Sequence, residues 1–189
     1  MIEYTYRQGL PGQTLQVGGS LMDIFIEKIV ARKKTGTDLL INGAIILATI
    51  ILIPVIFNIP VVGSMGILVV AAMVYGAYYL ITSKNLEYEY VVTNGDIDID
   101  KIVSQRKRKR IFSTSCKEFD ILARVKSSHY GRHVQDIKNK ITAVSSMDSE
   151  SAYFATLSYK GEKTVVFFEP DERMLNNFRT FISRKIMTE

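Results

Sequence analysis

Charged residues are missing from the middle of this chain. The 45 residues from 39 to 83 contain no Asp, Glu, Lys, Arg or His. An uncharged apolar stretch of about 18 residues or more predicts a membrane helix, because about 20 residues are needed to cross the hydrocarbon. This stretch has room for two such helices, at 39–57 and 61–81, with Asn58-Ile59-Pro60 as the break between them. We therefore predict a transmembrane helical hairpin over 38–83.

A buried helical hairpin in a soluble protein is the alternative, and the chain length argues against it. A chain of 189 residues has too little other sequence to cover two wholly apolar helices. Lys and Arg beside a span are retained on the cytoplasmic side, and they flank both outer ends of this stretch. Tyr75, Tyr78 and Tyr79 near the end of the second span suit the headgroup layer. We expect a cell-membrane protein with both termini in the cytoplasm.

Ionisable side chains are also absent from both predicted spans, which favours a membrane anchor over a transporter or proton relay. Asn42 and Thr49 are the polar side chains of the first span, and oligomerisation through Asn42 stays open. Small residues four apart let helices approach closely. The residues predicted to pack the helices in this way are Ala44, Ala48, Ala72 and Gly76.

Chemistry-bearing motifs are scarce. One cysteine, Cys116, excludes an internal disulfide. The chain has no Gly-rich phosphate loop, no paired Cys ligands and no G-x-S-x-G turn. His129 and His133 have metal-ligand spacing only on a helix, and Gly131 between them weakens that helix. We predict no enzyme, no cofactor and no metal, and a membrane-bound enzyme using Cys116 or His133 is the least favoured alternative.

The first 21 residues have neither a signal-peptide pattern nor a clear periodicity. Two residues, Ser20 and Leu21, separate the pair Gly18-Gly19 from Met22. A Gly-Gly pair can be encoded by a bacterial ribosome-binding sequence. Our hypothesis is that translation begins at Met22 and that 1–21 is a mis-assigned leader. A real N-terminal tail is the alternative.

Residues 22–37 are predicted to form an amphipathic helix in the membrane interface. Apolar residues recur at helical spacing, and basic residues follow just before the first span. Packing of the apolar stripe on the soluble domain is the alternative. The apolar stripe consists of Phe25, Ile26, Ile29 and Val30.

Beyond Lys84 the pattern changes to alternation, which predicts strands over 84–189. Asn94-Gly95 between two alternating runs is a strong hairpin signal, because both residues accept positive φ. A helix over 170–186 should close the domain, with Pro170 at its start. The seven expected strands are 87–92, 97–103, 109–114, 118–125, 141–145, 153–159 and 164–168.

This order of elements over 86–189 resembles the pleckstrin-homology-like fold. From Met22 onward, the segments MDIFIEKIV, LEYEYVVTNGDIDIDKIVSQRKRKR and CKEFDILARV, with two spans, are also similar to a family of uncharacterised two-span membrane proteins of Gram-positive bacteria. The resemblance implies an α+β membrane protein with a transmembrane hairpin and a mainly antiparallel, pleckstrin-homology-like β domain capped by a C-terminal helix. It implies no activity.

A run of five basic residues is the sharpest local feature of the domain. Near an anionic bilayer each cation contributes roughly 1 kcal/mol, and the net charge of +5 suits such a surface. Alternation along a strand would instead place one row of the run opposite Asp96, Asp98 and Asp100, where ion pairs form. Nucleic-acid binding lacks interleaved aromatics. The candidate contact residues are Arg106, Lys107, Arg108, Lys109 and Arg110, assisted by Lys28, Arg32, Lys33 and Lys34.

These observations favour a membrane-anchored, non-enzymatic binding or scaffold protein that contacts anionic lipid or a protein partner. The alternative is a small accessory subunit of a membrane transport or channel complex, or a homo-oligomer, held together through the hairpin. Neither hypothesis involves a small-molecule substrate.

Overall fold

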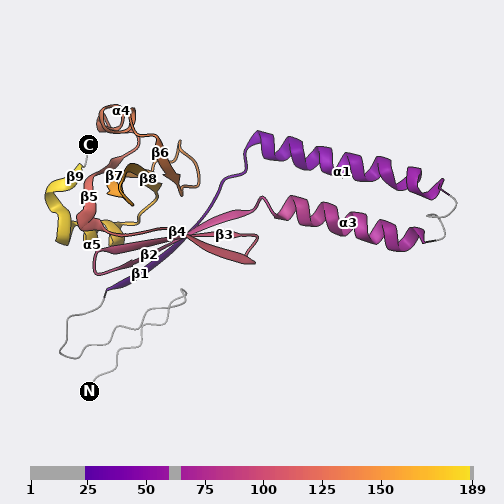
Figure 1. The fold of residues 1–189 in the computed structure, drawn as a ribbon, viewed down its shortest axis with the longest axis horizontal. Helices are drawn as coiled ribbons and strands as arrows, with labels where there is room; N and C mark the ends of the chain where they lie inside the picture. Colours follow the sequence, from indigo (N-terminus) through magenta and orange to yellow (C-terminus); the bar gives the residue numbers. More distant parts are fainter. Residues whose placement is uncertain (1–23, 60–64, 188–189) are drawn as a thin grey trace, which may run out of the picture.

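The computed structural model describes residues 24–59 and 65–187. The predicted tail over 1–21, the proposed start at Met22 and the beginning of the second predicted span lie outside these ranges. Figure 1 shows two long helices that project side by side from a domain built mainly of strands. The mixed α+β class is therefore confirmed.

The two projecting helices are α1 (Gly36–Phe57) and α3 (Gly66–Thr82). The 22 residues of α1 rise about 33 Å, and this helix is long and apolar enough to cross a membrane. The 17 residues of α3 rise about 26 Å, and this helix is apolar but shorter. A capping box between Thr35 and Asp38 starts α1, because it satisfies free backbone N–H groups of the first turn.

One face of α1 is half-buried in the described structure and the rest of the helix is exposed. Thr49 lies on the half-buried face, and its hydroxyl donates to the Ile45 carbonyl at 2.8 Å. At the far end of the pair, the Phe57 ring lies against Gly66, where an added Cβ would be 2.4 Å from Cε1. The polar side chains Asn42 and Thr49 therefore both lie on the half-buried face of α1, not on its exposed surface.

The small residues do not mediate this packing, which corrects the sequence prediction. The three alanines are exposed, and a Cβ added at the glycine would meet no atom within 4 Å. Both helices are apolar on all sides, so small-residue spacing alone did not mark the contact face. The residues concerned are Ala44, Ala48, Ala72 and Gly76.

The segment predicted as an interfacial helix over 22–37 contains strand β1 (Phe25–Ala31) instead. It pairs antiparallel with β2 (Leu86–Thr93), from Phe25 opposite Thr93 to Ala31 opposite Glu87. Ile26 and Val30 are buried, and a spacing of four satisfies both a helix face and one face of a strand. Pairing with the distant strand β2 makes this segment a strand and not a helix, so the helix prediction was wrong.

The first sheet has the order β1-β2-β3-β4 and is antiparallel throughout. Strands β3 (Asp96–Val103) and β4 (Lys107–Ser115) follow β2. Asn94 and Gly95 have φ of 50° and 89°, which confirms the predicted hairpin turn. Because β1 and β2 are neighbours, the helix pair is an insertion between adjacent strands of one sheet.

The second sheet has the order β6-β8-β7-β5-β9, with β5–β9 and β6–β8 parallel and the other pairs antiparallel. Short helices η1 (Cys116–Glu118), α4 (His129–Val134) and η2 (Ser183–Lys185) connect the strands. The described residues form nine strands where the sequence predicted seven, because β1 and β9 were not expected. The strands of the second sheet are β5 (Phe119–Arg124), β6 (Asn139–Thr142), β7 (Tyr153–Tyr159), β8 (Glu162–Phe168) and β9 (Ile186–Met187).

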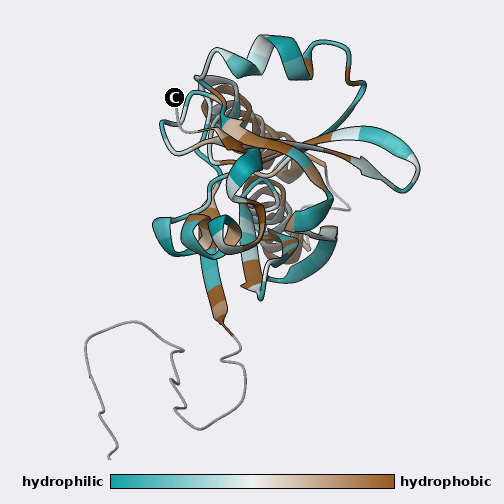
Figure 2. Ribbon diagram, turned by 90° about the vertical axis from the view of Figure 1, so that its left-hand side faces the viewer, coloured by the Kyte–Doolittle hydropathy of each residue, from teal (hydrophilic) through white to brown (hydrophobic). Residues whose placement is uncertain are grey.

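The C-terminal helix α5 (Glu172–Ile182) covers the core between the sheets. Its N-cap, Asp171, accepts a hydrogen bond from the Met174 amide at 2.8 Å. Phe178 packs edge-on against Phe119 and Phe168, with ring centroids 6.3 Å apart in both pairs. Hydrophobic residues (brown in Figure 2) lie along the strands, and hydrophilic residues (teal) predominate in the outer turns.

Candidate functional site

A cleft of about 320 Å³ lies where the helix pair joins the first sheet, and we call it the junction cleft. Three separate chain segments form its walls. They are the connection from β1 into α1, the connection from α3 into β2, and the turn between β3 and β4. The insertion of the helices between two neighbouring strands therefore creates the cleft.

The walls of the junction cleft carry five cationic side chains and two carboxylates. This excess of positive charge in a concave site favours an anionic ligand. Asp38 already pairs with Arg32 at 3.3 Å, and Glu87 accepts a hydrogen bond from Gln105 at 3.3 Å. The cations are Arg32, Lys33, Lys34, Lys84 and Arg106, and the acids are Asp38 and Glu87.

Lys84 is the most unusual of these cations. Its Nζ atom is buried and has no hydrogen-bond partner among the described residues. Burial of an ammonium group without a partner is costly, and an anionic group placed against it would offset that cost. Lys84 was not among the contact residues predicted from the sequence, although it is the first charged residue after the long uncharged stretch.

The turn between β3 and β4 closes one side of the cleft. Ser104 and Gln105 have φ of 53° and 56°, which reverses the chain in two residues. The Ser104 hydroxyl donates to the Thr82 carbonyl, and its amide donates to the Asn85 carbonyl at 2.8 Å. This docking places the Arg106 guanidinium 5.8 Å from the centre of the Tyr78 ring on α3.

The structure separates the basic run into groups with different roles. Arg108 pairs with Glu89 at 2.8 Å. Arg110 bridges Asp98 at 2.8 Å and Asp100 at 2.9 Å. The predicted alternation thus did bring one row of the run to an acidic face of the sheet, although Glu89 on β2 was not foreseen. These two arginines stabilise the sheet and lie outside the cleft.

Lys107 and Lys109 lie on the opposite face of β4, where the register places Lys109 beside Lys101. Both are exposed and form no ion pair in the described part of the chain. They are a separate, open patch of positive charge.

The cations before the first helix also divide. Lys28 donates from Nζ to the Glu169 carbonyl at 2.8 Å, which connects β1 to the end of β8. Arg32, Lys33 and Lys34 follow β1 and line the cleft. The structure therefore brings these three together with Arg106 in one cleft. Lys28 instead stabilises the fold.

The candidate catalytic residues lie on two different elements, with Cys116 on η1 and both histidines on α4. Cys116 is fully buried, and burial raises the pKa of its thiol to about 11, so the reactive thiolate is disfavoured. His129 and His133 both lie on α4 with ring centroids 6.3 Å apart. No group of three potential metal ligands occurs among the described residues.

The acidic face of the first sheet contains one perturbed group, Glu89. Burial raises the pKa of its carboxyl, and the hydrogen bond that the protonated Glu89 carboxyl donates to the Glu27 carboxylate acts in the same direction. Arg108 opposes both effects. This carboxyl is a structural group of the sheet with no opening to the junction cleft.

A family model described as a bacterial PH-like domain (DUF6106) matches residues 22–188. No curated protein and no solved structure gave a significant match. The match covers the helix pair and both sheets, and it agrees with the pleckstrin-homology-like resemblance of the strand order.

Proposed function

Because this chain belongs to the bacterial PH-like domain family, we propose that it is a membrane-anchored, non-enzymatic binding module. Membership of this family supports a binding or scaffold role in general. The ligand in our proposal is the anionic headgroup of a membrane lipid, held in the junction cleft at the cytoplasmic surface.

The observation that carries the proposal is the position of the cationic cleft at the base of two exposed apolar helices. The cleft lies where the chain enters α1 and leaves α3, which is the level of the headgroups if these helices enter the bilayer. Each cation near an anionic surface contributes about 1 kcal/mol. The buried Lys84 ammonium adds a specific point of attachment for a phosphate.

Two spans with cytoplasmic termini are part of this proposal. The outer ends of both helices join adjacent strands of one sheet, which supports placing these ends on the same side of the membrane. The length and hydropathy of α1 support a full crossing. Apolar sequence continues before the first described residue of α3, which supports a second crossing.

Single-cysteine labelling in cells tests the topology, because the native Cys116 is buried. We expect Asn58→Cys, at the far end of α1, to react with a membrane-impermeant maleimide in intact cells. Lys160→Cys, in an exposed domain turn, should react only after permeabilisation. Reaction of both positions only after permeabilisation would refute the two crossings.

Lipid retention tests the binding site with matched charge changes. The full chain is purified in detergent from membranes containing phosphatidylglycerol and phosphatidylcholine, and retained lipid is measured by mass spectrometry. Lys34→Gln with Arg106→Gln should lower phosphatidylglycerol retention about 30-fold, since two contributions of about 1 kcal/mol each are lost. Lys107→Gln with Lys109→Gln removes the same charge outside the cleft and should change retention little. Equal loss in both variants would mean diffuse attraction without a cleft site.

A second candidate function is favoured by the exposed alanines of the helix pair. Ala44, Ala48 and Ala72 lie on outward surfaces, where small residues permit close approach of another helix. An accessory subunit of a membrane complex, or a homo-oligomer, would use this surface. Loss of a co-purifying membrane protein or of the oligomer on Ala48→Leu, with lipid retention unchanged, would support it.

A further inference from the structure

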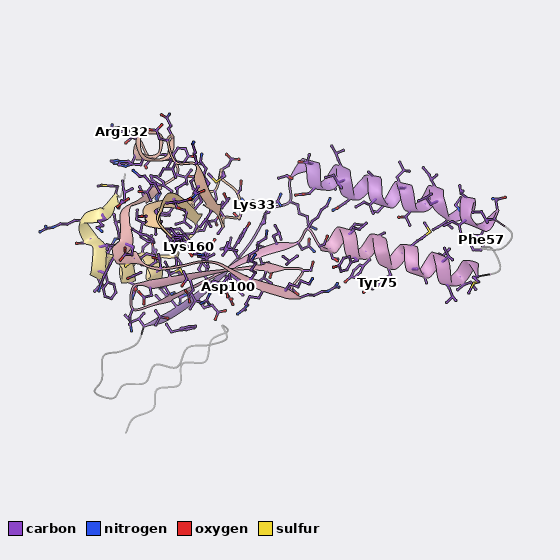
Figure 3. All side chains as sticks on the ribbon, in the orientation of Figure 1. Lys33, Phe57, Tyr75, Asp100, Arg132 and Lys160 are labelled. Carbon is purple, nitrogen blue, oxygen red and sulfur yellow. The ribbon has the colours of Figure 1, made fainter. Side chains whose placement is uncertain are left out.

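An open apolar groove runs along α3 beside the junction cleft, and we call it the α3 groove. Its lining is almost wholly apolar, and α1 does not cover it, because Ile67 and Tyr75 are 85% and 65% exposed. Figure 3 shows Tyr75 on the side of α3 that faces away from α1. The lining residues are Ile67, Val70, Ala71, Val74, Tyr75 and Tyr78.

The α3 groove and the junction cleft adjoin at Tyr78, which lines both. One side of this boundary is cationic and the other is apolar. Arg106 lies over the Tyr78 ring and so stands at the same boundary. A ligand that fills both spaces therefore has an anionic group at one end and a hydrocarbon part at the other.

The groove follows most of the length of α3. From Ile67 to Tyr78 the helix rises about 16 Å, a length close to that of one acyl chain, since two leaflets make up the roughly 30 Å hydrocarbon core. The groove begins beside the cleft, at the proposed headgroup level, and runs along α3 toward the far end of the helix pair. A single acyl chain would follow the same course if the headgroup of its lipid occupied the cleft.

We propose that one acyl chain of the lipid bound in the junction cleft lies in the α3 groove, so that the site takes an intact anionic phospholipid and not a soluble phosphate compound. This inference rests on the proposed lipid-binding function and extends it to the hydrocarbon part of the ligand. The helix pair is then part of the binding site as well as an anchor.

Tryptophan fluorescence tests the position of the chain, because the natural sequence contains no Trp. Tyr75→Trp places a reporter in the groove of the full chain in phosphatidylcholine nanodiscs. A small fraction of the lipid is replaced by phosphatidylglycerol or phosphatidylcholine with brominated acyl chains, which quench nearby tryptophan. Leu47→Trp, on exposed α1, is the control outside the groove.

We expect brominated phosphatidylglycerol to be enriched about fivefold over brominated phosphatidylcholine at Tyr75→Trp, and equal quenching by both lipids at Leu47→Trp. Adding Lys84→Gln should abolish the enrichment at Tyr75→Trp. Adding Lys109→Gln, outside the cleft, should preserve it. Glycerophosphate, a soluble headgroup analogue, should not displace the brominated lipid at equal concentration.

Three outcomes would overturn the inference. Equal quenching by both lipids at Tyr75→Trp, with cleft-dependent lipid retention intact, would mean a headgroup site without a chain site. The same preference at Leu47→Trp would mean general attraction of anionic lipid. A tryptophan shielded from both brominated lipids would assign the groove to a partner helix. Loss of cleft-dependent retention itself would refute the proposed function instead.

Discussion

Removal of one hydroxyl from Tyr90 should measurably loosen the contact between the two sheets. Tyr90 lies on β2 with no exposed surface, and its hydroxyl donates to the Ala143 carbonyl next to β6. The same oxygen accepts a hydrogen bond of 3.3 Å from the backbone amide of Glu169, at the end of β8. One side chain of the first sheet therefore satisfies two backbone groups of the second.

The substitution Tyr90→Phe keeps the ring and removes both hydrogen bonds. A buried polar group left without a partner costs about 1–3 kcal/mol, and the 3.3 Å bond contributes at the low end of that range. The phenylalanine avoids burying a hydroxyl, which offsets part of the loss. We expect the free energy of unfolding to fall by about 2 kcal/mol.

The buried thiol of Cys116 provides the assay, because it belongs to the same hydrophobic core as Tyr90. Labelling of this thiol in the full chain in detergent requires opening of the core. A fall of about 2 kcal/mol corresponds to labelling about 30 times faster. Tyr130→Phe is the control, since that hydroxyl has no hydrogen bond in the described structure. Equal labelling rates of Tyr90→Phe and Tyr130→Phe would refute the role assigned to the hydroxyl.

Three further predictions concern pH, a turn and a helix cap. Burial raises the pKa of the Glu89 carboxyl above its usual 4.5, so the folded chain binds this proton more tightly than the unfolded chain. The resulting stabilisation of the folded chain is present below pH 4.5 and is lost as the pH rises through the raised pKa. Thermal melts of Glu89→Gln over the same pH range should lack this loss of stability. Gly95→Ala should lower the free energy of unfolding by about 2 kcal/mol, because φ is positive and the new Cβ would lie 2.7 Å from Phe181. Gly161→Ala has a similar φ with open space around it, so a smaller loss is expected in the same melts, and an equal loss would show that the contact is unimportant. Asp171→Ala should cost about 1 kcal/mol by removing the cap of α5, and thiol labelling that is no faster than in the wild type would contradict this.

Local sequence was sufficient for elements that depend on neighbouring residues. The two apolar helices follow from a long stretch without charge, and the turn at Asn94-Gly95 follows from residues that accept positive φ. The C-terminal helix was predicted to start at Pro170, whereas the structure begins α5 at Glu172 with Asp171 as its N-cap. In each case the physical cause lies within a few residues of the element. The boundaries predicted for these elements differ from the structure by a few residues at most of their ends.

The charges show where sequence reasoning stopped. Alternation predicted, as one of two alternatives, that one row of the basic run would pair with acidic residues of the neighbouring strand, but only the fold identified Glu89 as the partner of Arg108. Lys84 was overlooked because its significance comes from burial among three chain segments. The cleft itself joins residues from 31 to 106, so no local pattern describes it.

Composition and local spacing therefore determined that this chain has two apolar helices, an antiparallel hairpin and a C-terminal helix. The tertiary structure decided that residues 25–31 form a strand, because their hydrogen-bond partners on β2 are about sixty residues away and a spacing of four does not separate strand from helix. It also decided which cations are neutralised within the sheet and which line the cleft. Pairing and burial depend on the whole fold, whereas turns, caps and hydropathy depend on the sequence alone.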